Sequence, residues 1–107
     1  MSFVPSAPYS GNPKIMMLDK KPEIASGIIW HQLDDQTVTV SPQSGKIRVF
    51  NGVGTFIWQK VVDGCTMTEI VHAITEQYDV DRDTAQKDVI AFINELVDRN
   101  ILTLPEA

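Results

Sequence analysis

Few residues of this 107-residue chain are of the types that carry out chemistry, and none stands in a catalytic arrangement. Cys65 is the single cysteine, and no histidine or lysine base stands beside it in the sequence. His31 and His72 lack the cysteine, histidine or carboxylate spacing that is typical of a zinc site. We therefore expect Cys65 to be a small turn residue and both histidines to lie at the surface. The sequence predicts no catalytic residue, no metal site and no cofactor.

Two short motifs look like the beginnings of ligand-binding loops. Gly52-Val-Gly54 has the spacing of neither the P-loop nor the dinucleotide fingerprint. Asp79-Val-Asp81-Arg-Asp83 starts like a calcium loop but lacks the glycine and the distal glutamate. We interpret both motifs as turns and helix starts.

Charge and composition exclude several classes of function. The net charge is −5 and the isoelectric point is about 4.8, which opposes general binding to nucleic acid and to anionic membranes. One cysteine excludes an intrachain disulfide. The N-terminus has neither the basic start nor the apolar run of a signal peptide, and no segment is long and apolar enough to span a membrane. We expect a soluble, cytoplasmic protein.

The pattern of apolar residues predicts three strands followed by three helices. Alternation and turn residues indicate strands over 26–33, 37–41 and 46–50, which tight turns join into an antiparallel meander, with Val38 and Val40 facing inward. Asn51 is expected to cap a helix over 52–62. Thr66 and Glu69 form a capping box for a second helix that ends near 78, and Asp81 caps a third over about 82–99. An extended end follows at 101–104.

This order of elements predicts an α+β fold, namely a small winged-helix-like domain with a three-stranded antiparallel sheet followed by three helices. We expect the domain to span residues 23–107. Residues 1–22 carry four of the six prolines, at positions 5, 8, 13 and 22, and are expected to form an extended arm. The one apolar patch of the arm is the run of residues 15–18.

The third predicted helix has a wider apolar arc than a core contact needs. At about 100° per residue, the narrow core stripe comprises Ala85, Val89, Phe92, Ile93 and Leu96. Ile90 and Val97 lie beyond this stripe, on one flank beside Gln86 and Asn94. Either these two residues are also core, or they line a groove. If strand 46–50 is a sheet edge, an incoming peptide could pair with it and fill pockets along this flank.

An ordered set of short motifs gives the chain a resemblance to the PqqD family. The motifs are Trp30-His-Gln-Leu-Asp-Asp35, Ser44-Gly45-Lys46, Phe50-Asn51, Gly54, Ile57-Trp58, Asp63-Gly64, Thr68-Glu-Ile70, Tyr78, Asp88-Val89, Phe92 and Leu96. The resemblance covers roughly residues 18–104. Phe50 stands where the family pattern has leucine, which is a conservative departure.

The resemblance implies a non-catalytic peptide chaperone that binds the leader of a ribosomally made precursor peptide and presents it to a modifying enzyme. In this family that enzyme is a radical S-adenosylmethionine protein or, in lasso-peptide systems, a leader protease and cyclase. The leader is expected to add as a strand beside Lys46, Ile47, Arg48, Val49 and Phe50. The facing helix positions would be Gln86, Ile90, Ile93, Asn94 and Val97. Lys46, Arg48 and Lys87 form a basic cluster that would favour an acidic leader.

Two other classes of function stay open from the residues alone. A winged-helix DNA-binding protein would use the third helix, whose carboxylates at 83, 88, 95 and 98 repel phosphate. A protein-interaction subunit would instead assemble through its edge strand or its arm, for example as a homodimer.

Overall fold

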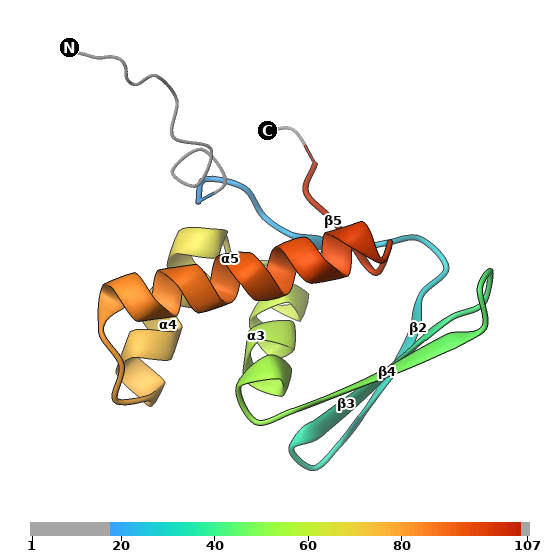
Figure 1. Cartoon of the computed structure of the whole chain (residues 1–107), viewed down its shortest axis with the longest axis horizontal. Coiled ribbons are helices and arrows are strands. Elements are labelled where there is room, and N and C mark those ends of the chain that lie inside the picture. Colours follow the sequence, from blue (N-terminus) through green and yellow to red (C-terminus); the bar gives the residue numbers. More distant parts are fainter. Residues whose placement is uncertain (1–17, 106–107) are drawn as a thin grey trace.

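The computed structural model describes residues 18–105; residues 1–17 of the predicted arm and residues 106–107 lie outside the described part. A three-stranded antiparallel sheet precedes three helices, as predicted, so the α+β fold class is confirmed (Figure 1). The elements in chain order are β1 Glu23–Ile24, β2 Ile29–Leu33, β3 Gln36–Ser41, β4 Lys46–Asn51, α3 Val53–Val62, α4 Met67–Gln77, α5 Arg82–Asp98 and β5 Leu102–Thr103.

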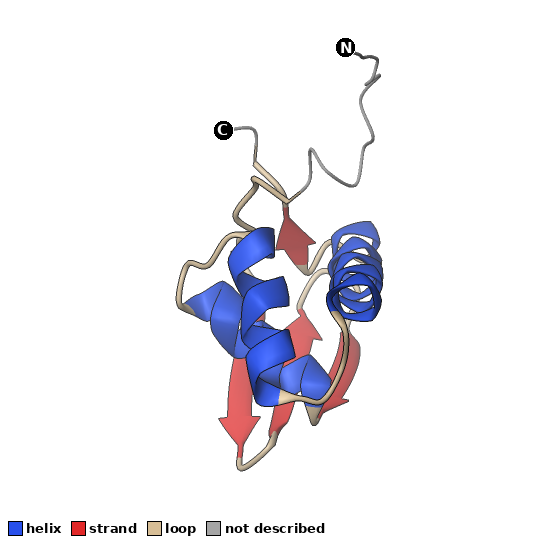
Figure 2. Ribbon diagram, turned by 90° about the vertical axis from the view of Figure 1, so that its left-hand side faces the viewer, coloured by secondary structure: helices blue, strands red, loops and turns tan. Residues whose placement is uncertain are grey.

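The main sheet is an antiparallel meander in the order β2-β3-β4. A second, two-stranded sheet joins β1 to β5, so the extended end predicted at 101–104 pairs with the beginning of the domain. The helices gather on one side of the main sheet, with α5 lying across α4 (Figures 1 and 2). The segment before β1 is held against the start of α4, where the backbone N–H of Thr68 donates to the Leu18 carbonyl oxygen at 3.1 Å.

The inner face of β3 differs from the prediction. Thr37 and Thr39 are completely buried beneath the helices, whereas Val38 and Val40 are only half-buried. The register explains this result, because Thr37 pairs with Phe50, which is itself buried in the core. Val38 and Val40 share the opposite face with their partners Val49 and Ile47, so the expectation that both valines point inward was wrong.

The junction between sheet and helices also differs from the prediction. Asn51 is the last residue of β4 and pairs with Gln36, so it does not cap the following helix. Gly52 occupies the cap position with φ +53°, and no side chain caps α3. The predicted capping box of Thr66 and Glu69 is confirmed at the start of α4.

The remaining helix boundaries follow the sequence signals. The Asp81 side chain accepts a hydrogen bond from the Thr84 N–H at 2.7 Å, so the predicted cap of α5 is confirmed. Asn100 ends the same helix in the left-handed region, with φ +61°. The Ile101 N–H then donates back to the Leu96 carbonyl oxygen at 2.9 Å, which closes the last turn of α5.

The core is built mainly from the three helices and Phe50 of β4. Trp58 is completely buried and packs edge-on against Trp30, with ring centroids 5.8 Å apart. Within residues 18–105, no helix is long and apolar enough to cross a membrane.

Candidate functional site

Strand β4 lies at one edge of the main sheet, since only β3 pairs with it within the part of the chain that the structure describes. The two-residue turn between β2 and β3 closes on the pair Leu33 and Gln36, and the closing pair of such a hairpin exchanges hydrogen bonds. Bonded and non-bonded pairs then alternate across the meander. This alternation leaves the backbone N–H and C=O groups of Ile47 and Val49 directed away from β3, toward the open edge.

The two faces of β4 have different surroundings. Ile47 and Val49 lie on the outer face of the sheet and are 64% and 57% exposed. Arg48 and Phe50 lie on the inner face, where Phe50 is buried and Arg48 is half-buried. A peptide strand added beside β4 would likewise turn every second side chain inward, toward α5.

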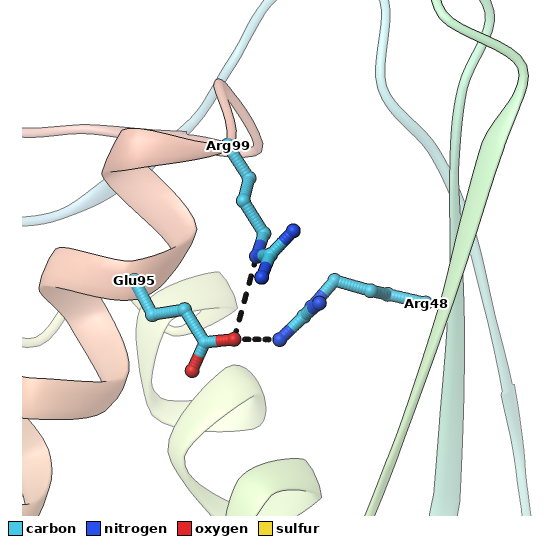
Figure 3. A network of polar contacts seen from close by, with 3 residues as sticks. All are labelled: Arg48, Glu95 and Arg99. Atoms are coloured by element: carbon cyan, nitrogen blue, oxygen red, sulfur yellow. Dashed lines mark hydrogen bonds and ion pairs between the residues drawn. The ribbon is translucent and has the colours of Figure 1, made fainter.

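Two contacts join the inner face of β4 to α5. The Phe50 ring meets the Phe92 ring edge-on, with centroids 5.2 Å apart. The Arg48 guanidinium forms an ion pair with Oε2 of Glu95, and Nε of Arg99 lies 3.4 Å from the same oxygen (Figure 3). These contacts identify the flank of α5 that faces β4.

A hollow of about 550 Å³ lies at the Lys46 end of this arrangement. The first half of β4, the turn before it, the segment 26–28 and the end of α5 surround it. Its ionisable lining residues are Lys46, Arg48, Asp98 and Arg99, and hydroxyl and amide groups of Ser41, Ser44 and Asn100 lie among them. The hollow therefore has a mixed polar and apolar lining and carries more cationic than anionic side chains.

The predicted strand residues and the predicted helix residues do not face one another. Contacts from β4 reach α5 at Phe92 and Glu95, whereas Gln86, Ile90, Ile93, Asn94 and Val97 lie on another arc of the helix, at about 100° per residue. Ile90 and Ile93 are buried in the core cluster, Gln86 and Val97 are half-buried, and Lys87 and Asn94 are exposed. The wide apolar arc is therefore largely core, and the residues of α5 that contact β4 are Phe92 and Glu95, with Arg99 paired to Glu95.

Sequence reasoning missed Glu95 and Arg99 as members of the site. Their spacing of four residues on one helix is a signal for an ion pair, and this pair is present. Arg48, 47 residues before Glu95, joins the same carboxylate through tertiary packing, which no local pattern reveals.

Residues capable of catalysis are not assembled at this site. Within residues 18–105, no group of three or more His, Cys, Asp or Glu side chains could hold a metal ion. Burial raises the pKa of the Cys65 thiol, and the Glu69 carboxylate raises it further, so the reactive thiolate is disfavoured.

Comparisons with known proteins find two solved structures with this fold and one matching family. A solved structure of TbiB1 in complex with the TbiA(beta) leader peptide is similar, with 29% identity and a TM-score of 0.75 over 79% of this chain and 99% of that one. A lasso peptide synthetase B1 complexed with the leader peptide has 23% identity and a TM-score of 0.72, over 78% of this chain and 98% of that one, and shares the fold. No curated protein matches the chain. The family model for coenzyme PQQ synthesis protein D matches residues 36–102, so the chain belongs to the PqqD family.

Proposed function

We propose that this protein is a peptide chaperone that binds the leader of a ribosomally made precursor by strand addition at β4. The open edge of β4, set beside α5, is the observation that carries the proposal. Main-chain hydrogen bonds to Ile47 and Val49 would supply affinity, while inward-facing leader side chains would meet Phe50 and the facing flank of α5. TbiB1, which is similar over most of its length, binds a leader peptide.

A chaperone of this kind presents its peptide to a modifying enzyme, either a radical S-adenosylmethionine protein or a leader protease and cyclase. The chain itself would perform no chemistry. It would act in the cytoplasm, where ribosomes make the precursor. A homodimer through the β4 edge would occupy the backbone groups that the leader needs, so dimer formation and leader binding would compete.

The DNA-binding alternative is disfavoured by the charges of α5. The helix exposes Asp83, Asp88, Glu95 and Asp98, and Glu95 is already paired with arginine. Phosphate would meet more carboxylates than free cations on this surface.

The substitution Val49→Pro tests strand addition directly. Proline removes the N–H that points to the open edge but leaves the ladder to β3 intact, and edge strands tolerate proline. We expect the domain to stay folded and the affinity for the leader to fall by about tenfold or more. The probe is the synthetic leader of the cognate precursor, which is to be sought in the neighbourhood of this chain's gene. It is titrated by calorimetry, with circular dichroism to check the fold.

The opposite edge of the sheet offers a matched control. On β2, the backbone N–H of Gln32 points outward by the same alternation, and the residue is exposed. Gln32→Pro should leave leader affinity unchanged. Equal affinity of a folded Val49→Pro variant and the wild type would contradict the proposal.

A further inference from the structure

Two arginines share one carboxylate at the Lys46 end of β4. Arg48 and Arg99 both contact Oε2 of Glu95, from opposite sides of the gap between β4 and α5 (Figure 3). Each guanidinium has five N–H donors, and one nitrogen of each contacts this oxygen. Both groups therefore keep donors in the fork arrangement that binds a carboxylate through two parallel hydrogen bonds.

The surrounding charges leave this cluster with a cationic excess. Lys46, Arg48 and Arg99 line the hollow, and they face Asp98 on its wall and Glu95 beside it. Three cations against two carboxylates is unusual on a chain whose net charge is −5. Partial burial lowers the pKa of Arg48, and repulsion from the Arg99 guanidinium lowers it further. An additional anion between the two arginines would relieve this repulsion.

Resting on the proposed leader binding, we propose that this hollow takes the side-chain carboxylate of an aspartate or glutamate in the bound peptide, held between Arg48 and Arg99. A strand beside β4 turns alternate side chains inward. The inward residue level with Arg48 would carry the carboxylate, and the inward residue two positions away would lie level with Phe50. The site therefore selects an acidic residue separated by one residue from an apolar one.

Asp98 and the Glu95 carboxylate, which both arginines already contact, oppose this preference. The arginines are also partly exposed, with side-chain exposures of 31% for Arg48 and 47% for Arg99. Both facts limit the strength of the interaction. The acidic subsite should thus fix the register of the peptide more than it raises affinity. An apolar anchor alone would let the peptide slip by two residues along β4, whereas the charged contact distinguishes the registers.

The test is selection from a display library of random 16-residue peptides, fused through their C-termini so that only side-chain carboxylates are available. Wild type, Arg99→Glu and Val49→Pro are used as baits. Arg82→Glu, at the far end of α5, is the matched control for the change in net charge. We expect wild type and Arg82→Glu to enrich aspartate or glutamate two positions from an apolar residue. Arg99→Glu should lose this preference or replace it with lysine or arginine.

A selected peptide then gives a quantitative check. Changing its acidic residue to the amide should weaken binding to the wild type about twofold to fivefold and leave binding to Arg99→Glu nearly unchanged. If the selected peptides lose binding to Val49→Pro yet show no preference for an acidic residue, that result would contradict the carboxylate subsite but not strand addition. If no peptide depends on Val49, strand addition fails and the subsite fails with it.

Discussion

Two threonines on the inner face of β3 differ in whether their hydroxyl groups have a partner. Thr37 Oγ1 donates to Thr55 Oγ1 at 3.1 Å, and Thr55 Oγ1 donates to the Phe50 carbonyl oxygen at 3.2 Å. Thr39 is equally buried, yet its Oγ1 has no hydrogen-bond partner in the described part of the chain. The Thr37 hydroxyl joins β3 to α3, and the Thr55 hydroxyl joins α3 to the end of β4. The Thr39 hydroxyl, in contrast, is a buried polar group without compensation.

This contrast predicts that replacing threonine with the isosteric valine changes stability in opposite directions at the two positions. Thr39→Val removes an unpaired buried hydroxyl and should raise the free energy of unfolding by about 1 kcal/mol. Thr37→Val breaks the bond to Thr55 and should lower it by about 1 kcal/mol. Urea unfolding followed by tryptophan fluorescence measures both values. A loss of stability in Thr39→Val as large as that in Thr37→Val would contradict the assignment of partners.

Local signals predicted most of the elements, because capping and periodicity act within a few residues. The capping box at Thr66 and the cap at Asp81 are present as expected. The cap at Asn51 is not, because cross-strand pairing with Gln36 extends β4 by one residue and moves the turn to Gly52. An N-cap preference amounts to roughly 1 kcal/mol, which tertiary pairing can override. The prediction of which face of β3 points inward was also wrong. Thr and Val are both common in strands, so the local pattern did not decide which of them faces the core.

The junction between β4 and α3 also depends on the close approach of Phe50 and Phe92 to Gly54. A Cβ atom at this position would lie 3.1 Å from Cβ of Phe50 and 3.3 Å from Cε1 of Phe92. Alanine gains up to about 1 kcal/mol in helix propensity. Overpacking costs about 1–3 kcal/mol, and here it would push apart the two rings that join β4 to α5.

We therefore expect Gly54→Ala to lower the free energy of unfolding by about 1–2 kcal/mol. Thermal unfolding by calorimetry would show the loss as a lower melting temperature. An unchanged or higher melting temperature would mean that the rings adjust freely and that the junction is not tightly packed.

In the whole molecule, the fold was predictable from the sequence, but the side of α5 that faces β4 was not. The period of α5 correctly indicated a broad apolar arc, which is largely core. It could not show that β4 approaches the helix from the side of Phe92 and Glu95, because that depends on where the sheet packs. The strand residues of the predicted site lie on an open edge, as β-augmentation requires, while the helix side of the groove had to come from tertiary contacts.

Amide hydrogen exchange measured by NMR, with and without saturating leader peptide, tests strand addition at β4. We expect the backbone N–H groups of Ile47 and Val49 to become protected when the leader binds, because each then donates to the added strand. The outward N–H of Gln32 on the opposite edge should exchange at an unchanged rate. Protection at Gln32 instead, or bound leader with no protection at Ile47 and Val49, would contradict strand addition at β4.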